Sequence, residues 1–259
     1  MIYSVEWKNL CVAYGDTEVI HNLSLSIESG EFVTVIGTSG CGKTTLMKTV
    51  NGLVMPKSGT VLTLGEDTAK TDLTALRRRI GYVLQGSVLF PNMTVEKNIS
   101  FVPRLIDPKD KEGAADTVRR LVKLVGLDEE LLRRYPDQLS GGQQQRVGIA
   151  RALAASPTLL LMDEPFSAVD EITRISLQAE IKRIHRETGV TILFVTHDIR
   201  EAVYLGTKLL VMDKGVLQQY ATPDEITANP ANAYVERLVQ RAKEPLNNSP
   251  SASAGQFAP

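Results

Sequence analysis

The sequence predicts an α/β fold built around a mainly parallel sheet. Three continuous apolar runs support this prediction: FVTVIG at 32–37, LLLMD at 159–163 and TILFVT at 191–196. Continuous rather than alternating hydrophobicity is typical of strands that are covered on both faces. Each run is followed by a stretch with helical character, and strands that alternate with helices form parallel sheets with crossover helices.

The other elements follow from local patterns in chain order. Residues 3–13 and 18–28 alternate apolar and polar side chains, which indicates half-buried antiparallel strands, with Gly15 and Asp16 in the turn between them. The stretch at 241–259 is rich in Ser, Ala, Pro and Asn, so we expect a disordered tail there and one folded domain over 1–240. The remaining expected elements are short strands at 59–64, 81–85, 209–213 and 216–220, and helices starting near 43 and near 72–78, 109–135, 171–187 and from 198.

The bulk composition narrows the class of protein. Of the 259 residues, 43% are hydrophobic, so the chain can bury a sizeable core. Its 29 Lys and Arg residues nearly balance 30 Asp and Glu residues, which argues against a nucleic-acid partner. No apolar run approaches the ~20 residues of a membrane-spanning helix, and the N-terminus lacks a secretory signal pattern. We therefore expect a cytosolic protein in which Cys11 and Cys41 are free thiols.

The segment GTSGCGKTT, residues 37–45, carries a phosphate-binding pattern. It matches G-x-x-x-x-G-K-[ST] and lies between an apolar strand and a helix, as that motif requires. In such a loop, the backbone amides and the positive end of the helix face phosphate oxygens. We expect Lys43 to reach the β- and γ-phosphates and the Thr44 hydroxyl to take a Mg²⁺ ligand position. The residues expected to contact the nucleotide are Gly37, Thr38, Ser39, Gly40, Cys41, Gly42, Lys43, Thr44 and Thr45.

This loop alone leaves kinases, GTPases and DNA motors open, although the Asn-Lys-x-Asp stretch of a guanine site is missing from the sequence. The carboxylates Asp163 and Glu164 stand at the end of an apolar strand, and we expect them next to the phosphate loop. Because adjacent strand residues point to opposite sides, Asp163 is expected to hold Mg²⁺ and Glu164 to polarise the water that attacks the γ-phosphate. Taken alone, an acidic pair at a strand end also fits a solvent-facing turn.

Between these two motifs lies LSGGQQQR, residues 139–146, and a histidine follows later in FVTHD. Together these segments resemble the ATP-binding subunits of ATP-binding-cassette (ABC) transporters over roughly residues 3–240. The resemblance implies a P-loop NTPase fold with an antiparallel β subdomain and an α-helical subdomain at about 86–155, and it implies ATP and Mg²⁺ as ligands. By the same resemblance, Tyr14 is expected to stack on adenine, and Gln85 to link Mg²⁺ and the attacking water to the membrane subunits. His197 is expected to be the switch that contacts the γ-phosphate. The signature consists of Ser140, Gly141, Gly142 and Gln143.

The resemblance also implies an assembly. In this family two chains sandwich two ATP molecules, each between the phosphate loop of one chain and the signature of the other, and SAVD at 167–170 resembles the segment along the dimer seam. The implied partners are a second copy of this chain, transmembrane permease subunits and, indirectly, a solute-binding receptor, at the cytoplasmic face of the cell membrane. His21 and His185 lie outside these motifs, and we expect both to be solvated.

Several further segments bear on the solute. LFPNMTVEKNI at 89–99, LLLMDEPFSAVDEITR at 159–174 and ATPDEITANPANAYVERLV at 221–239 are similar to the ATPases of importers for glycine betaine, choline or carnitine. The ATPases of polar amino-acid importers are closely related and remain an alternative, as does an exporter ATPase. An ABC ATPase of DNA repair or ribosome function is a further alternative. It is disfavoured because the sequence has no coiled-coil insertion, zinc-binding cysteines or second cassette.

Overall fold

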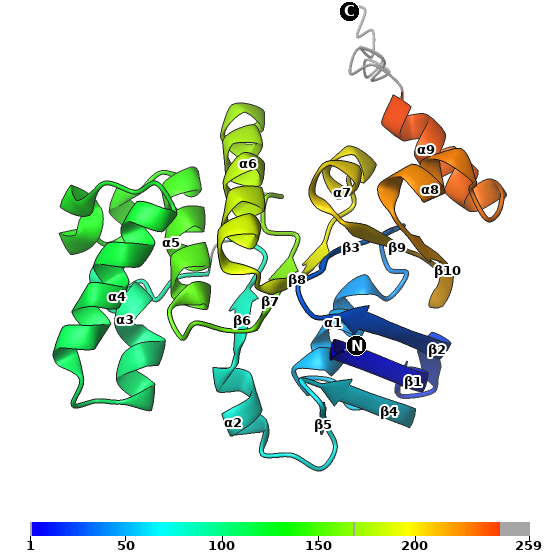
Figure 1. The fold of residues 1–259 in the computed structure, drawn as a ribbon, viewed down its shortest axis with the longest axis horizontal. Coiled ribbons are helices and arrows are strands. Elements are labelled where there is room, and N and C mark those ends of the chain that lie inside the picture. The colour runs from blue at the N-terminus through cyan, green and yellow to red at the C-terminus, as the bar shows by residue number, and fades with distance from the viewer. Residues whose placement is uncertain (1, 87, 168, 244–259) are drawn as a thin grey trace, which may run out of the picture.

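A six-stranded sheet forms the centre of the molecule and carries the segments expected to bind phosphate (Figure 1). The computed structural model describes residues 2–86, 88–167 and 169–243. The strand order is β10-β9-β3-β8-β7-β6, and all neighbours pair in parallel except β10, which is antiparallel to β9. The predicted parallel core is confirmed. Its strands are β3 (Phe32–Gly37), β6 (Ile80–Val83), β7 (Leu159–Asp163), β8 (Thr191–Val195), β9 (Lys208–Asp213) and β10 (Val216–Ala221).

The strand that ends at Asp163 is not the direct neighbour of the strand that leads into the phosphate loop. β8 lies between β7 and β3 and pairs with both. All three strands are buried along their whole length, which explains their continuous apolar character. Because they are parallel, their carboxyl ends meet at one edge of the sheet, and this edge gathers the loop and the carboxylates.

A second, antiparallel sheet has the strand order β2-β1-β4-β5. It consists of β1 (Tyr3–Tyr14), β2 (Thr17–Glu28), β4 (Ser58–Thr63) and β5 (Glu66–Asp67), as the alternating sequence predicted for the first two strands. Helix α1 (Lys43–Val50) contacts both sheets, so its position is set from two sides. At this junction the buried Trp7 donates from its indole Nε1 to Thr49 Oγ1 at 3.0 Å.

A mainly helical part, drawn green in Figure 1, lies at the far side of the core sheet from β10. Helix α4 buries Ala114, Val118, Leu121 and Val122, which share one face because their spacing follows the helical repeat. The sequence did not single out the first helix of this part, α3, which is capped by Thr94. Its buried Asn98 donates from the side-chain amide to the carbonyls of Phe90 and Met93, just before the helix. The elements of this part are α3 (Val95–Ile106), α4 (Lys111–Leu124), η1 (Glu129–Arg133), η2 (Pro136–Gln138) and α5 (Gly141–Leu153).

The remaining helices cover the core sheet and its edge. They are α2 (Leu73–Arg78), α6 (Glu171–Thr188), α7 (Ile199–Leu205), α8 (Pro223–Ala228) and α9 (Ala233–Lys243). The last three bury Ile199, Ile226 and Val235 against β9. Helix α9 continues to Lys243, so the expected tail begins inside a helix, and its stretch at 244–259 lies outside the described residues. Over the described part of the chain, every helix is too short or too polar to cross a bilayer.

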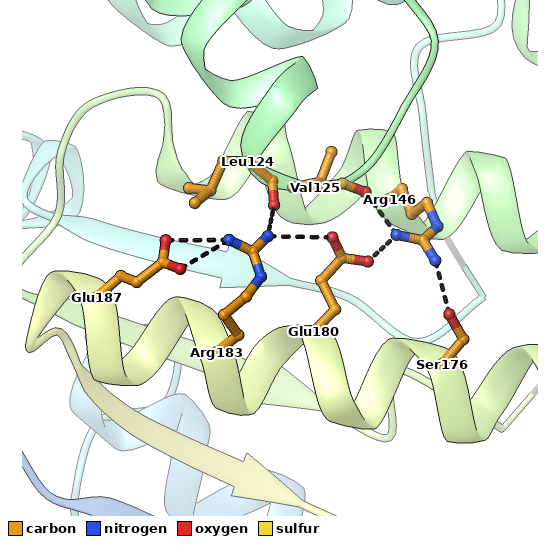
Figure 2. A network of polar contacts seen from close by, with 7 residues as sticks. All are labelled: Leu124, Val125, Arg146, Ser176, Glu180, Arg183 and Glu187. Atoms are coloured by element: carbon orange, nitrogen blue, oxygen red, sulfur yellow. Dashed lines mark hydrogen bonds and ion pairs between the residues drawn. The ribbon is translucent and has the colours of Figure 1, made fainter.

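A charged network joins the helical part to α6 of the core (Figure 2). We call it the seam network, and it consists of Arg146 on α5 and Glu180, Arg183 and Glu187 on α6. Arg146 pairs with Glu180 and donates to the Val125 carbonyl at 2.6 Å and to the Ser176 hydroxyl at 3.0 Å, and Arg183 donates to the Leu124 carbonyl. The guanidinium groups thus bind the carbonyl end of α4, where the helix dipole is negative.

Candidate active site

The phosphate loop connects β3 to α1 and depends on glycine at three positions. A Cβ on Gly37 would lie 2.2 Å from the carbonyl oxygen of Met212, so no side chain fits there. Gly40 and Gly42 have positive φ angles of 77° and 102°, which favour glycine. Helix α1 begins directly at Lys43, and no side chain caps its first amides. These amides remain available to an anion at the positive end of the helix.

Lys43 lies inside this loop. Its side chain is nearly buried, with 6% of the residue exposed, and Nζ donates to the carbonyl oxygens of Gly37 at 2.9 Å and Thr38 at 3.0 Å. No carboxylate forms an ion pair with Lys43 within the described residues. A nearly buried ammonium whose partners are neutral carbonyls can attract an anion to the loop.

Thr44 and Asp163 form the contact that joins the loop to β7. The Thr44 hydroxyl donates to Asp163 Oδ1 at 2.9 Å, across the intervening strand β8. Asp163 is 7% exposed, and this burial raises the pKa of its carboxyl above the ordinary value, while the Thr44 hydrogen bond and the charge of Lys48 oppose the shift. A buried carboxylate of this kind gains from a cation beside it.

This donor set fits Mg²⁺. The ion prefers oxygen ligands and is usually held by one or two carboxylates together with substrate phosphates and water. Thr44 and Asp163 supply a hydroxyl and a carboxylate oxygen at one point beside the phosphate loop. The described residues contain no group of three or more His, Cys, Asp or Glu side chains that could hold a metal ion.

Glu164 and His197 meet at the edge of the same site. Glu164 has a φ of 42°, a left-handed conformation that is uncommon for a residue with a side chain, and its amide donates to the Val195 carbonyl at 3.0 Å. This turn places Glu164 Oε2 3.3 Å from His197 Nδ1. The Glu164 side chain is 24% exposed and the His197 side chain 64%, so water reaches the pair. Strained backbone at such a position is typical of functional sites.

Two small hollows meet at Glu164. A cavity of about 190 Å³ is lined by Val19, by Glu164 and by the loop residues 39–45 except Cys41, and a second of about 40 Å³ is lined by Glu164, His197 and Thr196 among others. The loop and both carboxylates predicted from the sequence are therefore brought together in one chain. A cradle for phosphate, a hydroxyl–carboxylate pair and a water-accessible Glu–His pair can support transfer of a phosphoryl group to water.

The signature residues stand apart from these hollows, at the start of α5. Ser140 Oγ accepts from the Gln143 amide at 3.3 Å, and the Gln143 side chain accepts from the Ser140 amide at 2.9 Å, which forms a reciprocal cap. A Cβ on Gly142 would lie 2.4 Å from Cγ2 of Thr173, so glycine permits close packing against α6. Ser140 and Gly141 are exposed. None of the signature residues lines the hollows at Glu164.

Other expected site residues fall into two groups. Tyr14 and Gln85 are exposed at strand ends, Tyr14 with 53% of its surface accessible, so both are free to meet a ligand or partner. Thr38 and Cys41 instead belong to the base of the loop. The Thr38 hydroxyl donates to Asp213 at 3.3 Å, and Cys41 is a free thiol whose pKa is raised by burial. Of SAVD at 167–170, residue 168 lies outside the described residues, and Asp170 caps α6.

Two tertiary contacts were missed in the sequence, one at the base of the phosphate loop and one at the opposite end of β3. Tyr234 on α9 accepts from the Thr38 amide at 3.1 Å and donates to the Met212 carbonyl at 3.2 Å. These two hydrogen bonds hold the base of the phosphate loop against α9. His185 was expected to be solvated, but it is half-buried, bonds the Gly30 carbonyl at 2.9 Å and packs against Phe32. Both contacts join residues more than 150 positions apart, and no local pattern signals them.

A protein-family model described as ABC transporter matches residues 20–167. This chain belongs to the ABC transporter family. It is 49% identical over 230 residues to the glycine betaine/carnitine/choline transport ATP-binding protein OpuCA of Bacillus subtilis, covering 88% of this chain and 60% of that protein. It is 46% identical to the choline transport ATP-binding protein OpuBA of the same species, covering 91% and 62%. The chain thus spans about 60% of the length of these relatives.

Solved ABC cassettes share the fold. A post-hydrolysis dimer of the ATP-binding cassette MJ0796, bound to ADP and Pi, superposes with a TM-score of 0.76 at 33% identity and covers 85% of this chain and 98% of that one. CbiO1 of Clostridium perfringens, part of an ABC transporter complex, gives 0.81 at 28% identity and covers 93% and 94%. The architecture of this ABC chain is therefore that of a nucleotide-binding cassette.

Proposed function

We propose that this ABC chain is the ATP-hydrolysing subunit of an importer for a quaternary-amine osmoprotectant. The observation that carries the enzymatic part is the meeting of the phosphate loop, the Thr44–Asp163 hydrogen bond and the Glu164–His197 pair at one edge of the sheet. The importer part is supported by relatives whose names specify glycine betaine, carnitine or choline transport.

Each residue of the candidate active site has its own role in the proposed hydrolysis of ATP. The loop amides and Lys43 bind the phosphates, and the side chains of Thr44 and Asp163 would hold Mg²⁺, which neutralises charge that develops on the phosphate oxygens. Glu164 orients a water molecule and takes its proton, and His197, whose Nδ1 bonds the Glu164 carboxylate, is the switch that contacts the γ-phosphate. Tyr14 stacks on the adenine, and Gln85 reports the state of the site to the permease.

A second copy of the chain completes the site in this proposal. The signature residues of one chain stand away from its own phosphate loop hollows, with an exposed helix start that suits an anion held elsewhere. The γ-phosphate then contacts both chains, and its loss on hydrolysis removes the preference for the closed dimer. The solved relative MJ0796 is described as dimeric.

Mixing two inactive variants tests this arrangement. Lys43→Ala removes the phosphate loop charge, and Ser140→Arg blocks the signature. A mixed dimer retains one intact site, because the intact loop and the intact signature come from opposite chains. A random 1:1 mixture should therefore recover about a quarter of wild-type turnover, since half the dimers are mixed and each has one working site of two. Turnover that stays at the level of the separate variants would refute the shared site.

Glu164→Gln gives an independent test of dimer closure. This variant keeps the shape of the side chain but cannot take a proton, so it should bind ATP, hydrolyse it at least about a hundredfold more slowly and accumulate as a dimer. Light scattering at saturating ATP measures the mass, with ADP as the matched control. A Glu164→Gln chain that stays monomeric with ATP contradicts the proposal.

The solute needs its own experiment, because cassettes for different cargo are nearly equally similar. The chain is 45% identical to a sulfate/thiosulfate import ATP-binding protein of Caulobacter vibrioides, against 49% for OpuCA. Reconstitution with candidate permease and receptor subunits, followed by turnover measurements with glycine betaine, choline, sulfate or a polar amino acid, separates these cargoes. We expect stimulation by a quaternary amine, and stimulation by sulfate or an amino acid alone refutes the importer assignment.

A further inference from the structure

A sizeable cavity lies at the edge of the core sheet opposite the phosphate loop. It measures about 940 Å³, within the range of roughly 300–1,000 Å³ typical of ligand pockets. Its lining includes Gly30, which precedes β3, segment 156–158, which precedes β7, and Val190, which precedes β8. The phosphate loop follows the other end of β3, so the two sites are separated by the length of the sheet.

Three parts of the molecule meet around this cavity. Ile2 and Leu64 come from the antiparallel sheet region, Leu121 and Leu124 from α4 of the helical part, and Thr191 from the core. Leu64, Leu121 and Leu124 contribute apolar side chains to the lining. Ser4 and Thr191 also belong to the lining, but both are buried: the Thr191 hydroxyl accepts from the Gly30 amide at 2.9 Å and bonds the Ser4 hydroxyl at 2.8 Å.

The charge at the cavity is positive and largely comes from one residue. Three charged side chains line it. Glu6 pairs with Lys8 at 3.2 Å, and Arg79 pairs with Glu66. Arg120 on α4 is exposed and forms no ion pair within the described residues. A guanidinium at the mouth of a pocket with apolar side chains in its lining complements a molecule that has an anionic head and an apolar body.

We propose that this cavity binds a small amphiphilic anion, with a carboxylate, sulfonate or phosphate head on Arg120 and an apolar body against Leu121 and Leu124. The occupant would touch the helical part and the core at once. Leu124 also gives its carbonyl to Arg183 in the seam network, so the occupant would lie directly beside the contacts that join these two parts.

Anilinonaphthalene sulfonate is a suitable probe, because it has an anionic head and an aromatic body and its fluorescence rises in apolar surroundings. It would be titrated into the full chain with saturating ATP and Mg²⁺, so that the nucleotide loop is occupied. Two variants address the cavity: Arg120→Glu reverses the head contact, and Ile2→Asp places a charge at the apolar rim, where Ile2 is 81% exposed and tolerates it.

Matched controls exist for both variants. Arg119→Glu makes the same charge change one position away, at a side chain that does not line the cavity, and Ile172→Asp changes an isoleucine that is 84% exposed on α6. Circular dichroism confirms that all four variants fold. We expect one probe per chain, with affinity weakened about tenfold or more by Arg120→Glu and by Ile2→Asp and unchanged in both controls. Absence of probe binding at saturating ATP and Mg²⁺, or equal affinity of Arg120→Glu and Arg119→Glu, overturns the proposal.

Discussion

Replacing Glu180 by glutamine tests how the seam network joins the helical part to the core. Glu180 has 11% of its side chain exposed and pairs with Arg146, which has 17% exposed, and with Arg183 at 3.5 Å. Burial lowers the pKa of Arg146 from its ordinary value, but a guanidinium stays charged, so the negative charge of Glu180 is needed to compensate a partly buried positive charge. Glutamine has nearly the same shape but removes that negative charge.

The expected loss of unfolding free energy depends on the hydrogen bonds that Arg146 keeps after the substitution. Breaking a fully buried ion pair costs about 3–5 kcal/mol. The cost here should be lower, about 2–3 kcal/mol, because Arg146 keeps the Val125 carbonyl and the Ser176 hydroxyl as acceptors. For a chain of this size, each kcal/mol lowers the midpoint of thermal unfolding by about 2–4 °C, so we expect a decrease of about 4–12 °C.

Glu187→Gln is the matched control on the same helix. Glu187 is 49% exposed and pairs with Arg183 one turn away at 2.9 Å, a surface contact worth about 0.3–0.5 kcal/mol. Thermal unfolding without nucleotide, followed by circular dichroism, compares the variants. The reasoning fails if Glu180→Gln melts within about 2 °C of the wild type, or if Glu187→Gln costs as much.

Three further predictions concern the core, a buried carboxylate and the phosphate loop. Thr49→Val leaves the indole donor of Trp7 without its 3.0 Å acceptor and should cost about 1–3 kcal/mol in urea unfolding, read from this one tryptophan; unchanged stability would contradict it. Burial raises the pKa of Glu201 above its ordinary 4.5, so the folded state holds this proton more tightly than the unfolded chain and loses stability as the pH rises above about 4.5. Glu201→Gln does not titrate, so its stability relative to the wild type should increase as the pH rises above about 4.5, and parallel pH curves would refute this. Gly37→Ala puts a methyl group 2.2 Å from a β9 carbonyl and should weaken binding of a fluorescent ATP analogue about tenfold or more. Gly148→Ala, which has open space around its Cβ, should bind the analogue as the wild type does. Equal binding by the two variants would count against the steric argument.

Local patterns accounted for most of the secondary structure. Continuous apolar runs located the buried strands β3, β7 and β8, because a strand covered on both faces needs apolar side chains at every position. Helix α3, which is capped by Thr94, was not predicted from the sequence, because it carries an internal proline and a buried polar Asn98.

The candidate site was also largely predicted, since its residues stand in short motifs whose chemistry is local. A loop of glycines followed by Lys43 and Thr44 identifies a phosphate cradle wherever a strand and a helix flank it. The sequence did not show that β8 separates Asp163 from that cradle, nor that Tyr234 fastens its base. Strand order and helix docking depend on contacts between distant segments.

The amino-acid sequence by itself determined which groups do chemistry here: a cradle of amides, an ammonium, a hydroxyl and two carboxylates, each fixed by neighbours within a few residues. The tertiary structure alone decided that Thr44 bonds Asp163 across 119 positions, that Glu164 faces His197, and that the seam network and the cavity at Arg120 exist. The physical reason is range. Periodicity and turn chemistry act over a few residues, whereas hydrogen bonds and ion pairs between separate elements form only where packing brings those elements together.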